Sequence, residues 1–250
     1  MKLFVIIPMF NEAPLIAQTL NRLCEQTDRD FDVVVCDNGS TDESKAVTAR
    51  FIADRDLPWT IVDETRKGTG AAADTAARHA IRLGATHLAR TDADSLPDVN
   101  WVAAIKRAFT VDGHRFVAGL THPRTDDLDL SWLRAATLRR MNDVAIIFGQ
   151  LRPSNRGPQF RGPYLMAPGN NLAIDADLYE ECGGFTRTAI EEAHEDRNLV
   201  QALRQLTADY GLHREVIVYT SARRVQAWGI AKSLRWYAGH HFNPEKVDIR

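Results

Sequence analysis

The sequence predicts an α/β protein whose mostly parallel, Rossmann-like central sheet is flanked by helices. Three observations predict this class. Apolar runs recur through the first 120 residues, amphipathic segments separate them, and each run is continuous rather than alternating. Continuous runs are typical of parallel strands, since helices cover both faces of such a sheet. Ligands of these sheets bind at the carboxyl ends of the strands, so we expect the functional site at that edge.

The elements of the first half follow in order along the chain. We expect five strands, at 3–8, 31–36, 59–63, 86–91 and 115–120. The apolar face that defines the first helix consists of Leu15, Ile16, Leu20 and Leu23. Ser40 and Glu43 have the spacing of a capping box, so they predict the start of the next helix. Gly84 stands where the third helix should end.

The pattern changes after residue 120. A helical segment near 130–148 leads into a loop rich in proline and glycine, which is typical of a functional loop. The remaining elements are a short strand at 171–175, a helix, a turn at Gly183 and Gly184, a helix beginning near Glu195 and a strand at 215–220. Because no repeat or linker interrupts the chain, we expect one domain over 1–250. Its ligand-binding half is 1–120, and the other half, 121–250, is more variable and includes a smaller, mixed region.

Composition narrows the partners and the compartment. The chain has 31 basic and 33 acidic residues, a formal net charge of −2, so no global field would attract nucleic acid or an acidic membrane. Cys24, Cys36 and Cys182 are odd in number and far apart, which suits core thiols in a reducing compartment. No apolar run approaches the roughly 18 residues of a membrane helix. We therefore expect a soluble cytoplasmic protein, free or peripheral to a membrane.

Polar residues follow each of the first four strands. They are Asn11 and Glu12; Asp37 and Asn38; Asp63 with Arg66, Lys67, Gly68 and Gly70; and Asp92 with Asp94. At any single strand these residues would suit an ordinary turn. Four such ends at one edge of a parallel sheet surround a single crevice. The sequence therefore predicts a polar binding site there.

Three aspartates, Asp92, Asp94 and Asp98, crowd the end of the fourth strand with no obvious basic neighbour. If the chain stays extended, Asp92 and Asp94 point to the same side. Such a pair suits Mg²⁺ or Mn²⁺, whose other ligands would be water and phosphate. The alternative is that Asp94 and Ser95 form an Asx turn. We expect Asp98 to cap the next helix.

Several motifs together resemble those of family 2 glycosyltransferases, which have the GT-A fold. They occur in family order over about residues 1 to 200: IIPMFNE (6–12), VVCDNGSTDES (34–44), RKGTGAAADTA (66–76), RTDADS (90–95), PGNNLAI (168–174), GGF (183–185) and HED (194–196). The resemblance implies a nucleoside-diphosphate-sugar donor, usually with uracil as the base. It also implies that 1–120 is the nucleotide-sugar-binding half and 121–250 the acceptor-binding half.

The resemblance implies roles for individual residues of the first half. The backbone near Pro8, together with Asn11 and Glu12, would hold the nucleoside, and Asp37 would reach the base. Lys67 and Gly68 would belong to a loop that closes over the nucleotide.

Two further pairs acquire roles in the same way. Asp92 and Asp94 match the family's DxD motif, so Asp92 would face the ribose and the ion. Asp94 would bind the Mn²⁺ or Mg²⁺ that bridges the diphosphate. Asn170 and Asn171 would lie where the donor sugar and the acceptor meet.

The acidic run EEAHED at 191–196 has two interpretations. Acidic residues favour the first turn of a helix, so the run would also suit a solvated helix start. In the family the aspartate of the ED pair is the general base, which here is Asp196, with Glu195 or Glu192 as the other candidates. A base is needed because a hydroxyl that attacks an anomeric carbon must lose its proton as the bond forms.

The C-terminal part adds further candidates. Arg223 follows the last expected strand, where a guanidinium would pair with diphosphate oxygens or remain an ordinary surface group. KSLRW at 232–236 resembles the family motif QxxRW, although Lys232 replaces the glutamine. The resemblance implies a diphosphate role for Arg235 and an acceptor role for Trp236.

A pair of histidines follows this motif. His240 or His241 would either complete the metal site or belong to a polar tail. Members of the family that extend chains carry transmembrane helices in this region and this sequence has none, so we expect the transfer of a single sugar.

We therefore expect an inverting, metal-dependent glycosyltransferase that moves a sugar, most commonly from a UDP-sugar, to a hydroxyl of a saccharide, a lipid-linked intermediate or a small natural product. One alternative is a sugar nucleotidyltransferase, which would need a glycine-rich, basic loop directly after the first strand. Asn11, Glu12 and Pro14 stand there instead. The other alternative is an inactive protein that binds nucleotide sugars. The base, the sugar, the acceptor and the oligomeric state stay open at this point.

Overall fold

The computed structural model describes residues 1–124, 155–187, 195–221 and 223. The strands are β1 (Leu3–Met9), β2 (Asp32–Asp37), β3 (Thr60–Asp63), β4 (His87–Arg90), β5 (Ser95–Pro97), β6 (Phe116–Pro123), β7 (Leu172–Asp175) and β8 (Tyr210–Thr220). The helices are α1 (Ile16–Cys24), α2 (Ser44–Asp54), α3 (Thr69–Arg82), α4 (Trp101–Thr110), α6 (Ala176–Glu181) and α7 (Glu195–Leu206). The helix expected near 130–148 lies outside the described residues.

The strands form one sheet in the order β3-β2-β1-β4-β7-β6-β8-β5. β1, β2, β3 and β4 are mutually parallel, and β6 and β8 run in the same direction because each of the two steps from β4 to β7 and from β7 to β6 is antiparallel. Only β7 and β5 oppose this direction among the described strands. The predicted mostly parallel sheet is therefore confirmed, and the carboxyl ends of six strands meet at one edge.

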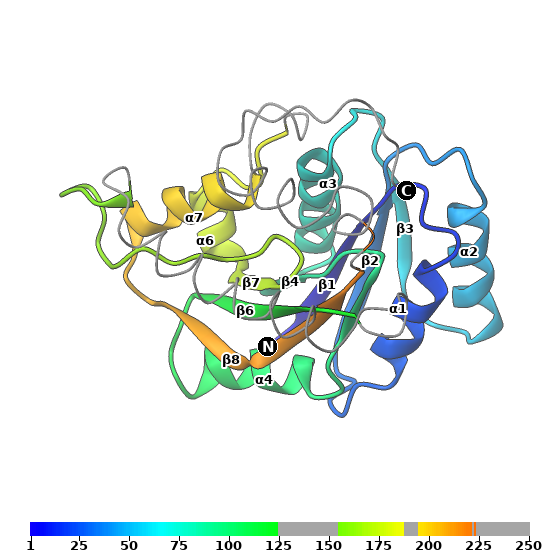
Figure 1. Cartoon of the computed structure of the whole chain (residues 1–250), viewed down its shortest axis with the longest axis horizontal. Helices are drawn as coiled ribbons and strands as arrows, with labels where there is room; N and C mark the ends of the chain where they lie inside the picture. The colour runs from blue at the N-terminus through cyan, green and yellow to red at the C-terminus, as the bar shows by residue number, and fades with distance from the viewer. Residues whose placement is uncertain (125–154, 188–194, 222, 224–250) are drawn as a thin grey trace.

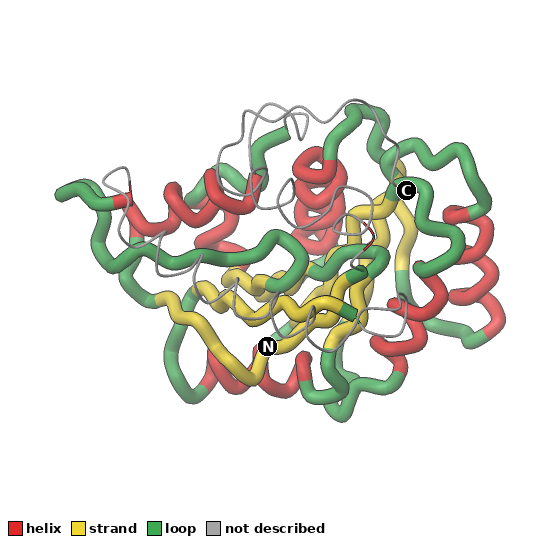
Figure 2. Tube along the Cα trace, viewed as in Figure 1, coloured by secondary structure: helices red, strands yellow, loops and turns green. Residues whose placement is uncertain are grey.

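Helices cover both faces of this sheet (Figure 1 and Figure 2). Along β1 the side chains alternate, so Phe4 and Ile6 join the core cluster beneath α3, α6 and α7, whereas Val5 and Ile7 join the cluster beneath α1, α2 and α4. The alanines of α3 at positions 71, 72, 73, 76, 77 and 80 are all fully buried. Their small side chains let α3 lie close to β1 and β2, so the loop before α3 is held against the sheet edge.

Two local predictions are confirmed by the backbone. Ile16, Leu20 and Leu23, three of the four predicted residues, lie on the buried face of α1, while Leu15 is the N-cap and is partly exposed. Gly84 has a φ of +87° just after α3 ends, which is a conformation that favours glycine at a helix C-terminus. Among the described residues no helix combines the length and the apolar character needed to cross a membrane.

The predicted capping box is wrong. α2 begins at Ser44, with Glu43 as its N-cap and no side-chain cap. The hydroxyl of Ser40 instead accepts a hydrogen bond from the Asn11 backbone N–H at 3.0 Å. A tertiary contact between two loops therefore takes the group that the local pattern assigned to the helix.

The prediction for Asp98 is also wrong in detail. The N-cap of α4 is Asn100, and the Asp98 carboxylate accepts a hydrogen bond from the Asn100 N–H at 3.0 Å. Residues 95–97 add a strand that the sequence did not indicate, because β5 is short and exists only through its antiparallel pairing with β8. This pairing brings the end of β8 next to the DxD segment.

Candidate active site

The loops after β1 and β2 are joined by side-chain contacts. Asn11 has a φ of +53°, and its Oδ1 accepts a hydrogen bond from the Thr41 N–H at 2.8 Å. The Glu12 N–H donates to the Ser44 hydroxyl at 2.7 Å, and the Glu12 side chain is only 8% exposed. These contacts fix Glu12 in the loop that follows β1. The last residue pair between β1 and β2 is Met9 with Asp37. Pro8 lies within β1 and pairs with Cys36.

The loop between β3 and α3 folds back over the end of β2. The Asn38 amide donates to the carbonyls of Glu64 at 2.9 Å and Arg66 at 2.8 Å, and its Oδ1 accepts from the Gly68 N–H at 2.9 Å. The exposed Lys67 ammonium donates to the Asn38 carbonyl at 3.0 Å and lies 4.1 Å from the centre of the Phe10 ring. The structure therefore brings Lys67 and Gly68 beside Asp37.

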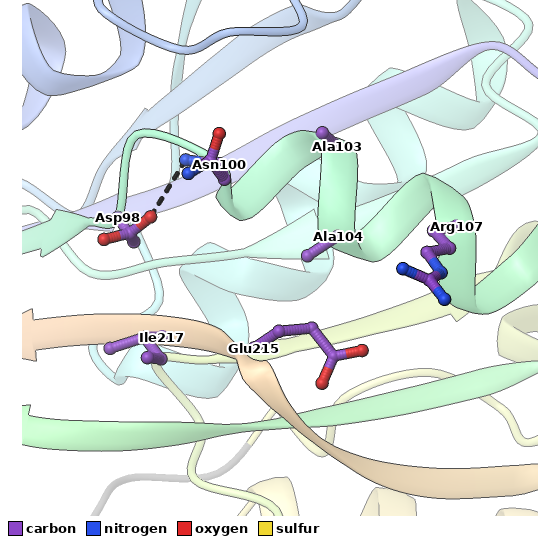
Figure 3. Close-up of a pocket in the computed structure, with 7 residues that line it drawn as sticks. All are labelled: Asp98, Asn100, Ala103, Ala104, Arg107, Glu215 and Ile217. Carbon is purple, nitrogen blue, oxygen red and sulfur yellow. Dashed lines mark hydrogen bonds between the residues drawn. The ribbon is translucent and has the colours of Figure 1, made fainter.

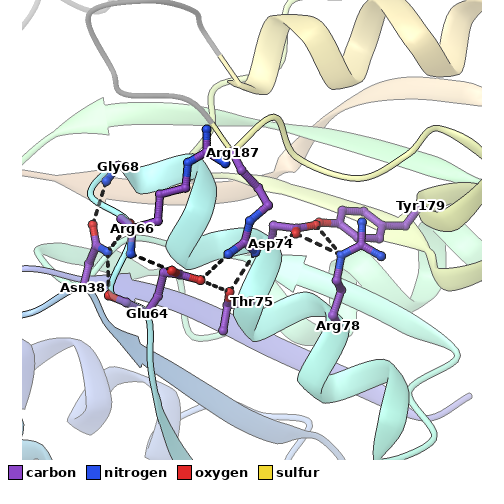
Figure 4. A network of polar contacts seen from close by, with 9 residues as sticks. All are labelled: Asn38, Glu64, Arg66, Gly68, Asp74, Thr75, Arg78, Tyr179 and Arg187. Atoms are coloured by element: carbon purple, nitrogen blue, oxygen red, sulfur yellow. Dashed lines mark hydrogen bonds and ion pairs between the residues drawn. The ribbon is translucent and has the colours of Figure 1, made fainter.

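A network of carboxylates and arginines lies beside this loop (Figure 4). Asp74, on α3, is fully buried and accepts hydrogen bonds from Arg78, from the Tyr179 hydroxyl at 2.8 Å and from Arg187 at 3.0 Å. Arg187 also forms an ion pair with Glu64. The network thus ties the segment that precedes α7 to the loop that carries Lys67.

The two aspartates of the DxD motif do not continue an extended strand, because residues 93 and 94 form a turn. The extended chain on which the same-side expectation depended is therefore not present at these residues. Each carboxylate also has a basic partner, contrary to the sequence-based expectation. The Arg90 guanidinium lies 3.5 Å from Asp92, and the Arg223 guanidinium lies 3.1 Å from Asp94.

Arg223 joins three segments of the site. Its Nη2 donates to the Glu12 carboxylate at 2.7 Å and to Asp94 at 3.1 Å. Burial alone would lower the pKa of this guanidinium, but the carboxylates of Glu12 and Asp94 raise it. The ends of β1, β4 and β8 therefore converge on one cationic group.

The donor set of the site fits a divalent ion only in part. The described residues contain no group of three or more histidine, cysteine or acidic side chains that would hold an ion by themselves. Mg²⁺ and Mn²⁺ are often bound by one or two carboxylates together with substrate phosphates and water. Asp92 and Asp94 suit that second arrangement. In the described structure Asp92 forms an ion pair with Arg90, and Asp94 forms one with Arg223.

The acidic pair that opens α7 divides into two different environments. Glu195 accepts a hydrogen bond from Arg90 at 3.1 Å, and only 14% of its side chain is exposed. Asp196 accepts from the Gly169 N–H at 3.1 Å and from the Arg197 N–H at 2.6 Å. Asp196 is thereby attached to the segment just before β7, at the same sheet edge as the DxD motif. Glu192, the other candidate base, lies outside the described residues.

Asn170 and Asn171 have different surroundings. The partly exposed Asn170 amide contacts Thr121 at 2.9 Å and Ser95 at 3.4 Å. Asn171 is fully buried; it donates to the carbonyls of Leu120 and Val216 and accepts from the Trp101 indole at 2.8 Å. The structure brings Asn170 to the site edge but leaves Asn171 inside the sheet, where it bridges an irregularity between β6 and β8.

Arg90, Glu64 and Arg187 are the residues of this region that sequence reasoning missed. Arg90 stands inside the RTDADS segment and ends an otherwise apolar strand, which was a usable signal. Arg187 has no comparable signal, since its partners are more than a hundred residues away in the chain. Arg235, Trp236, His240 and His241 lie outside the described residues.

Two surface pockets lie away from the DxD turn. One, of about 430 Å³, is formed by α4 and β8 and is lined by Asp98, Asn100, Ala103, Ala104, Arg107, Glu215 and Ile217 (Figure 3). It contains none of the predicted site residues.

The other pocket, of about 420 Å³, lies at the proline- and glycine-rich loop, which wraps around the buried Arg204. The Arg204 guanidinium donates to the carbonyls of Pro163 at 3.1 Å and Asn155 at 3.0 Å, and lies 4.1 Å from the centre of the Phe160 ring. The Tyr210 hydroxyl also donates to the Pro163 carbonyl, at 2.7 Å, so Arg204 and Tyr210 together hold this part of the loop.

The fold is an α/β fold of the GT-A class. Its mostly parallel sheet has the antiparallel β7 beside β4, and polar groups lie at the carboxyl ends of β1, β2 and β4. The sequence profile described as glycosyl transferase family 2 matches residues 4–178. The chain belongs to this family, as its motifs predict.

Two curated relatives are similar to the chain. It is 34% identical to glycosyltransferase AglE of Haloferax volcanii over 100 residues, which are 39% of this chain. It is 26% identical to validoxylamine A glucosyltransferase of Streptomyces hygroscopicus subsp. jinggangensis over 244 residues, which are 91% of this chain. These matches span 32% and 54% of the respective relatives, so the chain corresponds to about a third to a half of their length.

Solved structures agree on the fold. The chain superposes with a TM-score of 0.65 and 24% identity on the mannosyltransferase PcManGT of Pyrobaculum calidifontis, in complex with GDP-Man and Mn²⁺, over 94% of this chain and 64% of that one. For S. aureus TarS 1-349 in complex with UDP the TM-score is 0.64 and the identity 14%, over 98% of this chain and 68% of that one. At these identities the likeness concerns the fold alone.

Proposed function

We propose that this chain is a glycosyltransferase that moves one sugar from a nucleoside-diphosphate sugar to a hydroxyl acceptor with inversion at the anomeric carbon. The observation that carries the proposal is the convergence of Glu12, Asp37 and Asp94 at one sheet edge, next to an aspartate, Asp196, attached there through the Gly169 N–H. A metal-nucleotide site requires carboxylates such as Glu12, Asp37 and Asp94. A general base requires a separate carboxylate beside them, which is Asp196 in this proposal.

Each group has a part in the reaction that its surroundings support. Glu12 and Asp37 bind the nucleoside, and the exposed ammonium of Lys67 lies where it can meet a phosphate. The Arg223 guanidinium lies beside Asp94, so it can form an ion pair with the diphosphate oxygens when the donor binds there. Asp196 takes the proton of the acceptor hydroxyl as the new bond forms.

Mn²⁺ or Mg²⁺ would be held by Asp94 and Asp92 and would neutralise negative charge on the departing nucleoside diphosphate, as a Lewis acid does. A preference for Mn²⁺ is supported by the mannosyltransferase of the same fold, whose structure contains that ion. UDP is our proposed nucleotide, while GDP, present in that same structure, is the competing one.

We expect the proline- and glycine-rich loop, in the acceptor-binding half, to contribute to acceptor binding. Phe160 and Tyr164 line the pocket at this loop, and the Arg204 guanidinium lies over both rings. A saccharide, a lipid-linked intermediate and a small natural product remain the three acceptor classes to compare.

A sugar nucleotidyltransferase is the weaker candidate. The loop after β1 holds Asn11 and Glu12 and is closed by contacts with Thr41 and Ser44, so it offers no glycine-rich, basic surface for a triphosphate. The family match agrees with this conclusion.

A thermal-shift screen of UDP-, GDP- and TDP-sugars, with and without Mn²⁺, tests the proposal. We expect one nucleotide class to raise the melting temperature, and to raise it more when Mn²⁺ is present. The donor so found is then incubated with candidate acceptors, and the anomeric configuration of the product is determined by NMR. A melting temperature that no nucleotide sugar changes, with or without the ion, would contradict the proposal.

A further inference from the structure

Arg90 is an unusual residue to end a central strand. Arg90 is only 1% exposed although it terminates β4, and its guanidinium lies 5.0 Å from the centre of the Phe185 ring. Two of its nitrogens, Nε and Nη1, are buried without a hydrogen-bond partner in the described part of the protein. Burying a charge with unsatisfied donors costs stability, so packing alone gives no reason for a guanidinium here.

The remaining nitrogen joins two segments that are distant in the chain. Arg90 Nη2 donates to Asp92 in the DxD turn at 3.5 Å and to Glu195 in the first turn of α7 at 3.1 Å. These two carboxylates are the only ion-pair partners of Arg90 among the described residues. One nitrogen atom therefore links the nucleotide side of the site to the helix that begins with the proposed base.

Asp196 belongs to the same packed group. A Cβ added at Gly169 would lie 3.4 Å from Arg90 Nη2 and 3.4 Å from Asp196 Oδ2, so both groups flank the same backbone position. Burial would lower the pKa of Arg90, but Asp92, Glu195 and Asp196 together raise it. The guanidinium therefore stays charged and is held by carboxylates on two sides.

We propose that Arg90 is a positioning residue for the transfer reaction: it anchors Glu195, and through the first turn of α7 it holds Asp196 at a fixed place relative to Asp92. The expected effect of Arg90 on sugar transfer rests on the proposed function, whereas its contacts with Asp92 and Glu195 do not. Glu195 is then an anchor of the helix rather than the base. A misplacement of the base by about 1 Å is enough to cost on the order of 10²-fold in rate.

The kinetic test compares Arg90→Lys with Arg115→Lys. Arg115 is a matched control because it also bridges two carboxylates, Asp175 at 3.0 Å and Glu181 at 3.1 Å, at the opposite edge of the sheet. We expect Arg90→Lys to lower kcat by roughly 10²-fold and to leave the KM for the donor within about threefold, because the contact with Asp92 is the longer one, at 3.5 Å, whereas loss of the 3.1 Å bond to Glu195 moves the base. Arg115→Lys should change neither value.

A second measurement needs no turnover. Hydrogen exchange of the free protein is followed in peptides that cover 165–171 and 195–199, in the wild type, in Arg90→Lys and in Arg115→Lys. We expect faster exchange in both peptides for Arg90→Lys alone. Glu195→Gln keeps the oxygen that accepts the Arg90 hydrogen bond, so it should exchange more slowly than Glu195→Ala.

The two measurements separate the two ideas. If the wild type transfers no sugar from any donor, the proposed function fails, and the exchange data still decide the role of Arg90. If exchange in both peptides is the same in Arg90→Lys and in the wild type, the positioning role is overturned. It is equally overturned if kcat is unchanged, or if the loss appears in the donor KM instead of kcat.

Discussion

The guanidinium of Arg223 lies 3.1 Å from the carboxylate of Asp94, so the chain just beyond β8 reaches the loop that follows β4. The same nitrogen also contacts Glu12, at the end of β1. A positive group thus stands beside the aspartate to which the DxD resemblance assigns the ion. When an ion and a diphosphate bind there, Arg223 has a second set of negative partners available in the phosphate oxygens.

This relationship predicts the result of Asp94→Asn, which removes the charge and keeps the shape. We expect the Mn²⁺-dependent part of UDP binding to fall by roughly 100-fold, the upper end of what even an outer-shell partner contributes to metal affinity. Binding without Mn²⁺ should change little. Calorimetric titration with and without the ion measures both parts.

Asp98→Asn is the matched control for this prediction. Asp98 belongs to the same acidic segment but faces the start of α4, where it accepts a hydrogen bond from the Asn100 N–H. It should therefore bind UDP as the wild type does in both conditions. An Asp94→Asn variant that keeps the full effect of Mn²⁺ would remove Asp94 from the metal site.

Asp196→Asn tests the proposed base. Asparagine can still accept hydrogen bonds from the N–H groups of Gly169 and Arg197, but it cannot take up a proton. We expect donor binding to stay the same while kcat falls by about 10²- to 10⁴-fold. Steady-state kinetics together with donor titration distinguish the two effects.

Asp177→Asn provides the comparison for Asp196→Asn. Asp177 is an exposed acidic residue in the first turn of another helix, α6, so the same change is made at a similar position in a helix. It should keep the wild-type rate. If Asp196→Asn also kept it, the role of base would pass to another carboxylate.

Sequence reasoning located the strands and the site edge because both follow from short-range patterns. Continuous apolar runs specify parallel strands, and the direction of those strands brings Glu12, Asp37 and Asp94 together without any knowledge of side-chain contacts. The family motifs then assigned roles to these residues.

Sequence reasoning failed where the hydrogen-bond partner of a side chain comes from a distant segment and not from its own helix or loop. Ser40 bonds to Asn11 rather than to its own helix, and Asn171, adjacent to Asn170 in the sequence, is turned into the core. Arg90 and Arg187 are stabilised by carboxylates from distant segments, so their position depends on the complete fold. No periodicity within a window of sequence carries that information.

We expect the alanine variants of the two asparagines to differ: Asn171→Ala should mainly lower stability, and Asn170→Ala should mainly weaken sugar transfer. Asn171→Ala leaves the Trp101 N–H and the carbonyls of Leu120 and Val216 without their partner inside the core. Unsatisfied buried groups cost about 1–3 kcal/mol each, so we expect a loss of about 3 kcal/mol or more in the free energy of unfolding.

Asn170→Ala removes contacts to Thr121 and Ser95 at a partly exposed position. We expect it to lower the free energy of unfolding by about 1 kcal/mol and to weaken sugar transfer more than that change explains. Urea unfolding and transfer assays on both variants are compared. Equal losses of stability would contradict the structural role of Asn171 in the core and the separate role of Asn170 at the site edge.

Glu64 predicts how stability depends on pH, through the network in Figure 4. Burial would raise the pKa of its carboxyl, but the Thr75 hydroxyl, the Arg66 N–H and the Arg187 guanidinium lower it below its usual value. A carboxyl with a lowered pKa in the folded state contributes stability above its unfolded pKa, about 4.3, and loses that contribution as the pH falls through the folded pKa.

We therefore expect the difference in free energy of unfolding between the wild type and Glu64→Gln to be largest near neutral pH and to shrink as the pH falls below about 4.3. Urea unfolding at a series of pH values from neutral to acidic measures it, with Glu43→Gln, at an exposed position, as the control for the loss of one carboxylate. Since many groups contribute to acid unfolding, only the difference between variants reports on Glu64. A difference that stays constant or grows on acidification would mean that Arg187 and Thr75 do not stabilise the ionised form of Glu64.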